Sequence, residues 1–137
     1  MTRYIIFADD DSDDLELITG YFKQFDPSIN VLEFKNGKEV LKFLEEFAIV
    51  TALPMLVVLD VNMPKINGKE TLIAMRKHPK LNKIPVIIYS TSSGNMEADF
   101  CKKYAATWVN KPADINQVKN VAKVIADFCL QFNNVQR

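Results

Sequence analysis

The chain has 137 residues, 48% of them hydrophobic, and 17 Lys and Arg balance 17 Asp and Glu, which predicts one globular domain of zero net charge. This composition argues against a general nucleic-acid binder, which needs a basic surface, and against a membrane protein, because no apolar run reaches about 18 residues. Two cysteines without metal-ligand spacing and the absence of a signal-peptide pattern indicate a cytoplasmic protein.

The first half of the chain alternates between short apolar runs and helical patterns. Tyr4–Ala8 is a β-type run that ends at a group of aspartates. Ser12 then caps a helix that continues to Phe25, because apolar residues follow at helical spacing. A strand over Val31–Phe34 and an Asn-Gly turn lead to an amphipathic helix over Val40–Phe47. Met55–Leu59 is apolar at every position, which predicts a strand buried on both faces.

The second half continues the alternation. Thr71–Arg76 is typical of a helix that ends before a proline, and Val86–Tyr89 is the next strand. A helix around Met96–Tyr104, a strand at Thr107–Asn110 and a long helix over Ile115–Phe132 complete the pattern. Five strands alternating with five helices imply parallel crossovers, and therefore an α/β fold with a doubly wound sheet covered on both faces.

Polar residues stop four of the five predicted strands. Asp9 and Asp10 follow the first strand, Asp60 the third, Ser90 the fourth and Lys111 the fifth. Because the crevice of an open α/β sheet lies beyond the C-terminal ends of its strands, we expect these groups to converge on one rim. The three carboxylates would repel one another unless a hard divalent cation, most plausibly Mg²⁺, and the lysine ammonium neutralise them.

This arrangement could support phosphoryl transfer. With a cation bound, Asp60 can act as a nucleophile on phosphorus and form an aspartyl phosphate. Lys111 and the cation can neutralise the phosphoryl oxygens, and Ser90 can donate a hydroxyl to one of them. Each residue alone has a structural explanation, and Asp11, Asp13 and Asp14 are best explained as acids at a helix N-terminus. Only the joint placement at successive strand ends favours a functional site.

The order and spacing of these residues resemble the receiver domain of two-component response regulators. The matching acceptor loop is Asp60-Val61-Asn62-Met63-Pro64 followed by Gly68, and the pair Asp9-Asp10, Ser90 and Lys111-Pro112 complete the set. The resemblance covers roughly residues 4–132. It implies a flavodoxin-like, three-layer fold with five helices and a five-stranded parallel sheet in the order 2-1-3-4-5. We expect residues 1–137 to form one receiver domain without an output domain.

The resemblance also implies roles for single residues at the acidic site. Asp60 would be the phospho-acceptor, assisted by Lys111. Mg²⁺ would be bound by the side chains of Asp10 and Asp60, by the backbone carbonyl of Asn62, and by Asp9 through a water molecule.

Two further implications concern the conformational response. Ser90 would be the switch hydroxyl and Trp108 the switch aromatic residue, although packing of Trp108 at the sheet edge explains this tryptophan equally well. The peptide bond between Lys111 and Pro112 would be cis, as is common in the family.

The implied function is that of a phospho-accepting signalling protein. A histidine kinase or phosphotransfer protein would donate the phosphoryl group, and a downstream protein would bind the last two helices and the fifth strand. The protein would not be an enzyme in the sense of turnover, because it would only phosphorylate itself stoichiometrically and lose the group slowly. We expect a monomer or a weak homodimer, with no nucleic acid or membrane as a partner.

Other classes share parts of this pattern. A phosphatase of the haloacid-dehalogenase type also uses a strand-end Asp and Mg²⁺, but its Asp-x-Asp pattern, which Asp9 and Asp11 would match, needs Thr or Val two residues further on, where Asp13 stands. An FMN carrier of the flavodoxin type needs a Ser-, Thr- or Gly-rich phosphate cradle after the first strand, not aspartates. A calcium loop starting at Asp9 lacks Gly at its sixth position and Glu at its twelfth.

Overall fold

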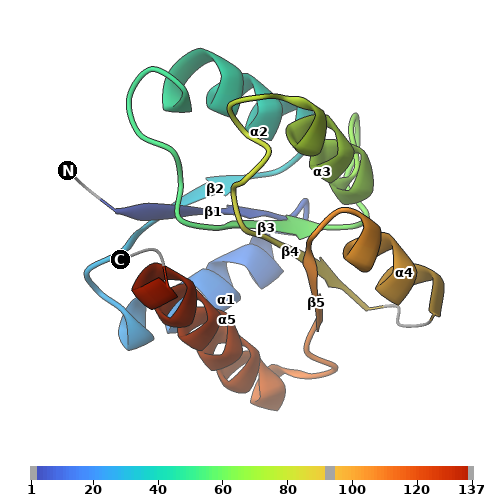
Figure 1. Ribbon diagram of the computed structural model, residues 1–137. Coiled ribbons are helices and arrows are strands. Elements are labelled where there is room, and N and C mark those ends of the chain that lie inside the picture. Colours follow the sequence, from blue (N-terminus) through green and yellow to red (C-terminus); the bar gives the residue numbers. More distant parts are fainter. Residues whose placement is uncertain (1–2, 92–94, 136–137) are drawn as a thin grey trace.

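The computed structural model describes residues 3–91 and 95–135, and these residues form a five-stranded parallel sheet between two layers of helices (Figure 1). The strands are β1 (Tyr4–Ala8), β2 (Asn30–Phe34), β3 (Val57–Asp60), β4 (Val86–Ser90) and β5 (Thr107–Asn110). Their order in the sheet is β2-β1-β3-β4-β5, and every neighbouring pair is parallel. The expected fold class and strand order are confirmed.

The described residues also form five α-helices and one π-helical turn. These are α1 (Ser12–Phe25), α2 (Gly37–Phe43), the π-helical turn η1 (Leu44–Ala48), α3 (Gly68–Lys77), α4 (Asn95–Lys103) and α5 (Ile115–Val135). In Figure 1, α1 and α5 lie on one side of the sheet and α2, α3 and α4 on the other. In the described part of the chain, no helix has the length and hydropathy that would let it span a membrane.

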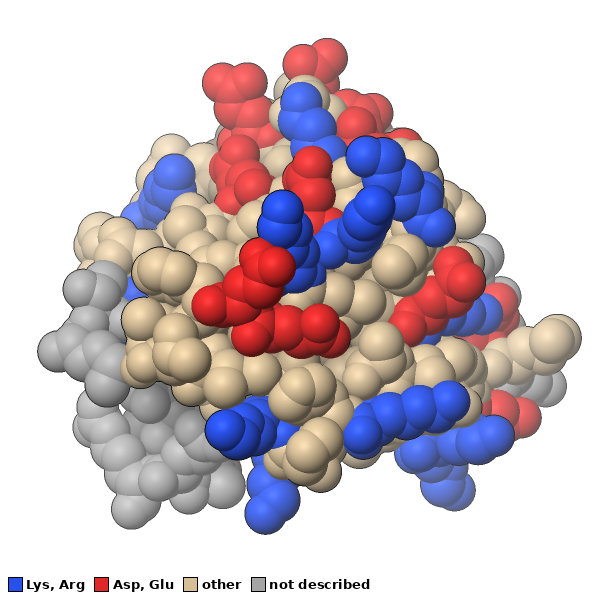
Figure 2. Space-filling view, turned by 90° about the horizontal axis from the view of Figure 1, so that it is seen from above, with Lys and Arg blue, Asp and Glu red and all other residues tan. Residues whose placement is uncertain are grey.

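Each face of the sheet has its own hydrophobic core. Side chains alternate along β1, so Ile5 and Phe7 pack toward α1 and α5, whereas Ile6 and Ala8 pack toward α2 and α3. This double burial explains why the central strands are apolar at every position. On the outer face formed by α2 and α3, acidic and basic side chains are interspersed (Figure 2), so that face has no continuous basic field.

Helix α1 begins one residue earlier than predicted. Its N-cap is Asp11, whose Oδ1 accepts hydrogen bonds from the backbone N–H groups of Asp13 at 3.0 Å and Asp14 at 3.1 Å. The prediction of Ser12 as the cap is therefore wrong. A carboxylate accepts two N–H groups and also brings negative charge to the positive end of the helix, which a hydroxyl does not.

The start and end of the second helix also differ from expectation. The Asn-Gly pair is not a free turn, because Asn36 caps α2 by accepting the N–H of Glu39 at 2.9 Å. At the other end, the helix widens into η1, whose hydrogen bonds span an additional residue and rotate the following side chains relative to an α-helical pattern. Phe47 is therefore 56% exposed instead of facing the core, with its ring tilted against that of Phe43 at a centroid distance of 5.3 Å.

A single arginine joins α3 to two loops at the far side of the sheet. The Arg76 guanidinium donates to the carbonyls of Tyr104 at 2.7 Å, Ile84 at 2.9 Å, Ala105 at 3.0 Å and Asn82 at 3.3 Å. Ala105 has a left-handed backbone with φ of 54°, which costs about 1 kcal/mol or more without such support. These bonds tie α3 to the connection that leads into β5.

Candidate functional site

Three aspartates meet at the C-terminal rim of the sheet, as the sequence predicts. Asp9 and Asp10 follow β1 and Asp60 ends β3, and one carboxylate oxygen from each lies within 4.8 Å of the others. Asp9 and Asp60 are buried, whereas Asp10 is exposed. The rim therefore combines two buried acids with one that faces solvent.

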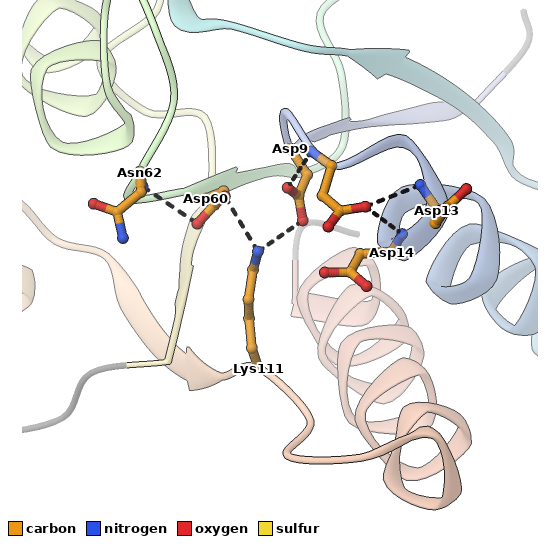
Figure 3. Close-up of polar contacts among 7 residues, drawn as sticks. Asp9, Asp13, Asp14, Asp60, Asn62 and Lys111 are labelled. Atoms are coloured by element: carbon orange, nitrogen blue, oxygen red, sulfur yellow. Dashed lines mark hydrogen bonds and ion pairs between the residues drawn. The ribbon is translucent and has the colours of Figure 1, made fainter.

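Lys111 enters this cluster from the end of β5 (Figure 3). Its Nζ lies 2.9 Å from Asp9 Oδ2 and 3.2 Å from Asp60 Oδ2, and its side chain is only 14% exposed. One ammonium thus bridges two buried carboxylates. Because the pair of acids carries two negative charges against one positive charge, a negative charge remains before Asp10 is counted.

Burial and neighbouring charges shift the pKa values of Asp60 and Lys111, but a different influence prevails at each group. Burial raises the pKa of Asp60 to about 6, and the charge of Asp9 adds to this rise, whereas Lys111 and the Asn62 N–H at 3.3 Å act in the opposite direction. Burial alone would lower the pKa of Lys111, but its bonds to Asp9 and Asp60 outweigh burial and raise it. Lys111 is therefore a permanent cation, and Asp60 is ionised at a free-energy cost.

The donor set fits a hard divalent cation. Carboxylate oxygens are the preferred ligands of such ions. Asp9 Oδ2 is buried and pairs with the Lys111 ammonium at 2.9 Å, but one ammonium cannot neutralise the three carboxylates that meet here. The negative charge that remains is what a cation would neutralise. The rim can therefore bind a divalent metal ion.

Ser90 and Trp108 lie on the two strands beyond Asp60. Ser90 is buried at the end of β4 and is aligned with Asn110 on β5. Trp108 is half-buried on β5, an edge strand, where it packs against the core beneath α3 and α4. Its Nε1–H donates to Asn110 Oδ1 at 3.1 Å. The structure thus shows the packing role of Trp108, and its role as a switch stays a prediction.

The expected cis bond is absent, because the peptide bond between Lys111 and Pro112 is trans. The trans form is the lower-energy isomer before proline by about 0.5–1 kcal/mol. It is compatible here with a strand-like continuation of β5, in which the Lys111 N–H donates to the Ser90 carbonyl at 2.8 Å. Lys111 reaches the acids without the other isomer.

Sequence reasoning missed one residue of the site and could not foresee one cavity. The ring of Tyr89 lies under Lys111, with Nζ 5.3 Å from the ring centroid. Its place one residue before Ser90 was the only available signal. A hollow of about 800 Å³ lies beside β2 and is lined mainly by apolar side chains such as Tyr4, Phe43 and Phe47. Another hollow, of about 480 Å³, borders the acidic site and is lined in part by Tyr89 and Lys111.

The protein has a doubly wound parallel sheet with an acidic, lysine-bridged cluster at its C-terminal rim. These features place it among the α/β proteins whose binding site lies beyond the C-terminal ends of the strands. Within that class, the sequence profile of the response regulator receiver domain matches residues 5–123. The chain belongs to this family, and it is therefore a receiver domain of two-component signalling.

Several known proteins are similar over nearly the whole chain. The probable methanogenesis regulatory protein FilR2 of Methanothrix harundinacea is 25% identical over 133 residues, which cover 94% of this chain and 84% of FilR2. Response regulator Rcp1 of Synechocystis is 24% identical over 134 residues, covering 94% and 90%. The crystal structure of the phosphorylated cyanobacterial phytochrome response regulator RcpA has a TM-score of 0.84 at 27% identity, covering 95% of each chain. A Mn²⁺-bound structure of Rcp1, 22% identical with a TM-score of 0.82 over 92% of this chain and 93% of Rcp1, shares the fold.

Proposed function

We propose that this receiver domain carries a phosphoryl group on Asp60, received from a histidine kinase or phosphotransfer protein in a Mg²⁺-dependent reaction. The observation that supports this most directly is the Asp60 carboxylate itself. It is 5% exposed at the end of β3, with the Lys111 ammonium at 3.2 Å and other carboxylates within 4.8 Å. A buried, ionisable nucleophile beside a fixed cation is what phosphoryl transfer requires.

The protein residues would act by position and charge. A carboxylate oxygen of Asp60 attacks phosphorus while the P–N bond of a phosphohistidine breaks, and the bonding electron pair leaves with the imidazole. Because the pKa of Asp60 is about 6, the carboxylate is mostly ionised at neutral pH and needs no general base. Lys111 can then donate to one phosphoryl oxygen and Ser90 to another.

The metal would be bound by Asp10, Asp60, the backbone carbonyl of Asn62 and, through water, Asp9. When bound, Mg²⁺ supplies neutralisation of the charge on the transferred phosphoryl oxygens. Few protein ligands and an exposed Asp10 favour Mg²⁺ over Ca²⁺, because Mg²⁺ usually keeps several of its waters.

The phosphoryl group would alter a protein-binding surface. Its charge and acceptor oxygens attract Ser90 and Lys111, and both lie at the ends of strands that lead into the segments before α4 and α5. Exposed apolar side chains on α4 and α5, among them Met96 and Ile115, support a downstream protein binding there. The protein would act in the cytoplasm as a monomer or weak homodimer. It would accept one phosphoryl group per chain and lose it slowly by self-dephosphorylation, without catalytic turnover.

The test is the intact mass of the protein after acetyl phosphate, with Mg²⁺ and with EDTA. We expect one added phosphoryl group on the wild-type chain and none on Asp60→Asn, and labelling only with metal. Asp127→Asn is the matched control, because Asp127 is an exposed acid on α5 that pairs with Lys123, away from the acidic site. Labelling that survives Asp60→Asn would refute the acceptor, and continuous release of phosphate from a phosphomonoester would indicate a phosphatase instead.

A further inference from the structure

Tyr89 is placed by the sheet directly beside the acidic cluster. It is aligned with Asp60 across β3 and β4 and is only 2% exposed. One side of its ring is supported by Phe7, in an edge contact at 6.2 Å with an interplanar angle of 88°. Since strand pairing and core packing both fix this ring, its position relative to Asp60 does not depend on a loop.

The ring completes the surroundings of the Lys111 ammonium. A cation within about 6 Å of an aromatic centroid is attracted by the ring, and the attraction grows when the cation is removed from water. Nζ lies 5.3 Å from the Tyr89 centroid, 2.9 Å from Asp9 and 3.2 Å from Asp60. Three groups on three different strands or strand ends therefore hold one flexible lysine side chain.

An aromatic ring holds a cation differently from a third carboxylate. It adds no net negative charge, so it does not repel an incoming phosphoryl group. Burial raises the pKa of the Tyr89 hydroxyl, so this group also stays neutral and adds no charge to the site. When Lys111 exchanges its bond to Asp60 for one to a phosphoryl oxygen, its contacts with Asp9 and with the ring can persist.

We propose that Tyr89 is a positioning residue, whose ring holds the Lys111 ammonium beside Asp60 and so sets the rate of phosphoryl transfer. This inference rests on the proposed phosphorylation of Asp60. The ring and not the hydroxyl performs this role, so Tyr89→Phe preserves it and Tyr89→Leu removes it.

The kinetic test is the rate of labelling by acetyl phosphate with Mg²⁺, followed by intact mass. We expect Tyr89→Leu to react about fivefold more slowly or worse, and Tyr89→Phe to stay within about twofold of the wild type. Phe7→Leu changes the packing of the Tyr89 ring without removing the ring, so it should slow labelling less than Tyr89→Leu does. Tyr89→Ile provides a second ring-free variant, and all variants are compared below their thermal unfolding transitions.

A double-mutant comparison separates positioning from general damage. If Tyr89 acts through Lys111, adding Tyr89→Leu to Lys111→Met slows labelling no further. An additional loss in that background, or equal rates for the leucine and phenylalanine variants, would overturn the role of Tyr89 alone.

An NMR readout tests the geometry without any phosphorylation. The ring current of Tyr89 shifts the ε-methylene protons of Lys111, and this shift should persist in Tyr89→Phe and vanish in Tyr89→Leu. A shift that is unchanged in the leucine variant overturns the contact. Absence of labelling on the wild-type chain overturns the proposed function and, with it, the kinetic role of the ring.

Discussion

The ionised form of Asp60 should destabilise the metal-free protein, so Asp60→Asn should stabilise it. Burial and then the charge of Asp9 raise the pKa of Asp60 from 3.8 to about 6. The folded state thus binds this proton more tightly than the unfolded state. The contribution of Asp60 to stability is therefore fully present below about pH 4, is lost as the pH rises from about 4 to about 6, and stays lost above that range.

The size of the effect follows from the shift in pKa. Two units at about 1.4 kcal/mol each give an upper value of about 3 kcal/mol for the cost of the charge above pH 7. The amide of Asn removes that charge at nearly constant volume. Lys111 is not orphaned by the change, because it keeps its closer partner Asp9 at 2.9 Å. For a domain of this size, the midpoint of thermal unfolding should rise by up to roughly 10 °C.

Urea unfolding followed by far-UV circular dichroism measures this difference. In EDTA at about pH 7.5, Asp60→Asn should unfold at higher urea than the wild type, and the difference should fall to about a third of that size at about pH 4.5. Mg²⁺ should narrow the gap by stabilising the wild type. The control Asp127→Asn should change little at either pH. Equal midpoints at the higher pH, or an undiminished difference between the midpoints at the lower pH, would refute the reasoning.

Three other predictions concern stability and reactivity. Arg76→Ala should lower the free energy of unfolding by about 2 kcal/mol, and Arg76→Lys should recover less than half, because an ammonium cannot span four carbonyls; urea unfolding measures both. Gly68→Ala should lower the free energy of unfolding by about 1–3 kcal/mol, because the new Cβ would lie 2.2 Å from the backbone carbonyl oxygen of Asp60. Gly20→Ala should raise the free energy of unfolding by about 0.5–1 kcal/mol, because Gly20 lies within α1 and has open space around it. A destabilised Gly20→Ala variant would contradict this prediction. Cys101 and Cys129 are buried with raised thiol pKa values, so a thiol reagent should label them only on the timescale of unfolding.

The sequence was informative about the fold because each strand is a short apolar run stopped by a polar residue. Predicted and observed strands agree within two residues, and β1 and β5 agree at both ends. The helix ends were harder, since Asp11 and Ser12 are both good caps and only the structure shows which one accepts the N–H groups. Phe47 was misplaced because nothing in the spacing indicates a π-helical turn.

At the site, the sequence predicted which residues meet but not how they divide the charge. Asp9 and Asp10 are neighbours in sequence, yet one is buried against Lys111 and the other faces solvent. Tyr89 was counted only as a strand residue, because a contact between a ring and an ammonium depends on the conformation of a long side chain. The isomer at Pro112 likewise depends on tertiary context that a sequence does not contain.

The three-layer arrangement places the acidic site and the outer helix faces on different parts of the molecule. The acids and the lysine are anchored on the inner sheet, whereas the outer faces of α2, α3, α4 and α5 are turned away from them. Under the proposed function, substitutions on those faces would change which signalling partner binds without altering the acidic site. Such a separation would let the same acidic site serve in many different signalling pathways.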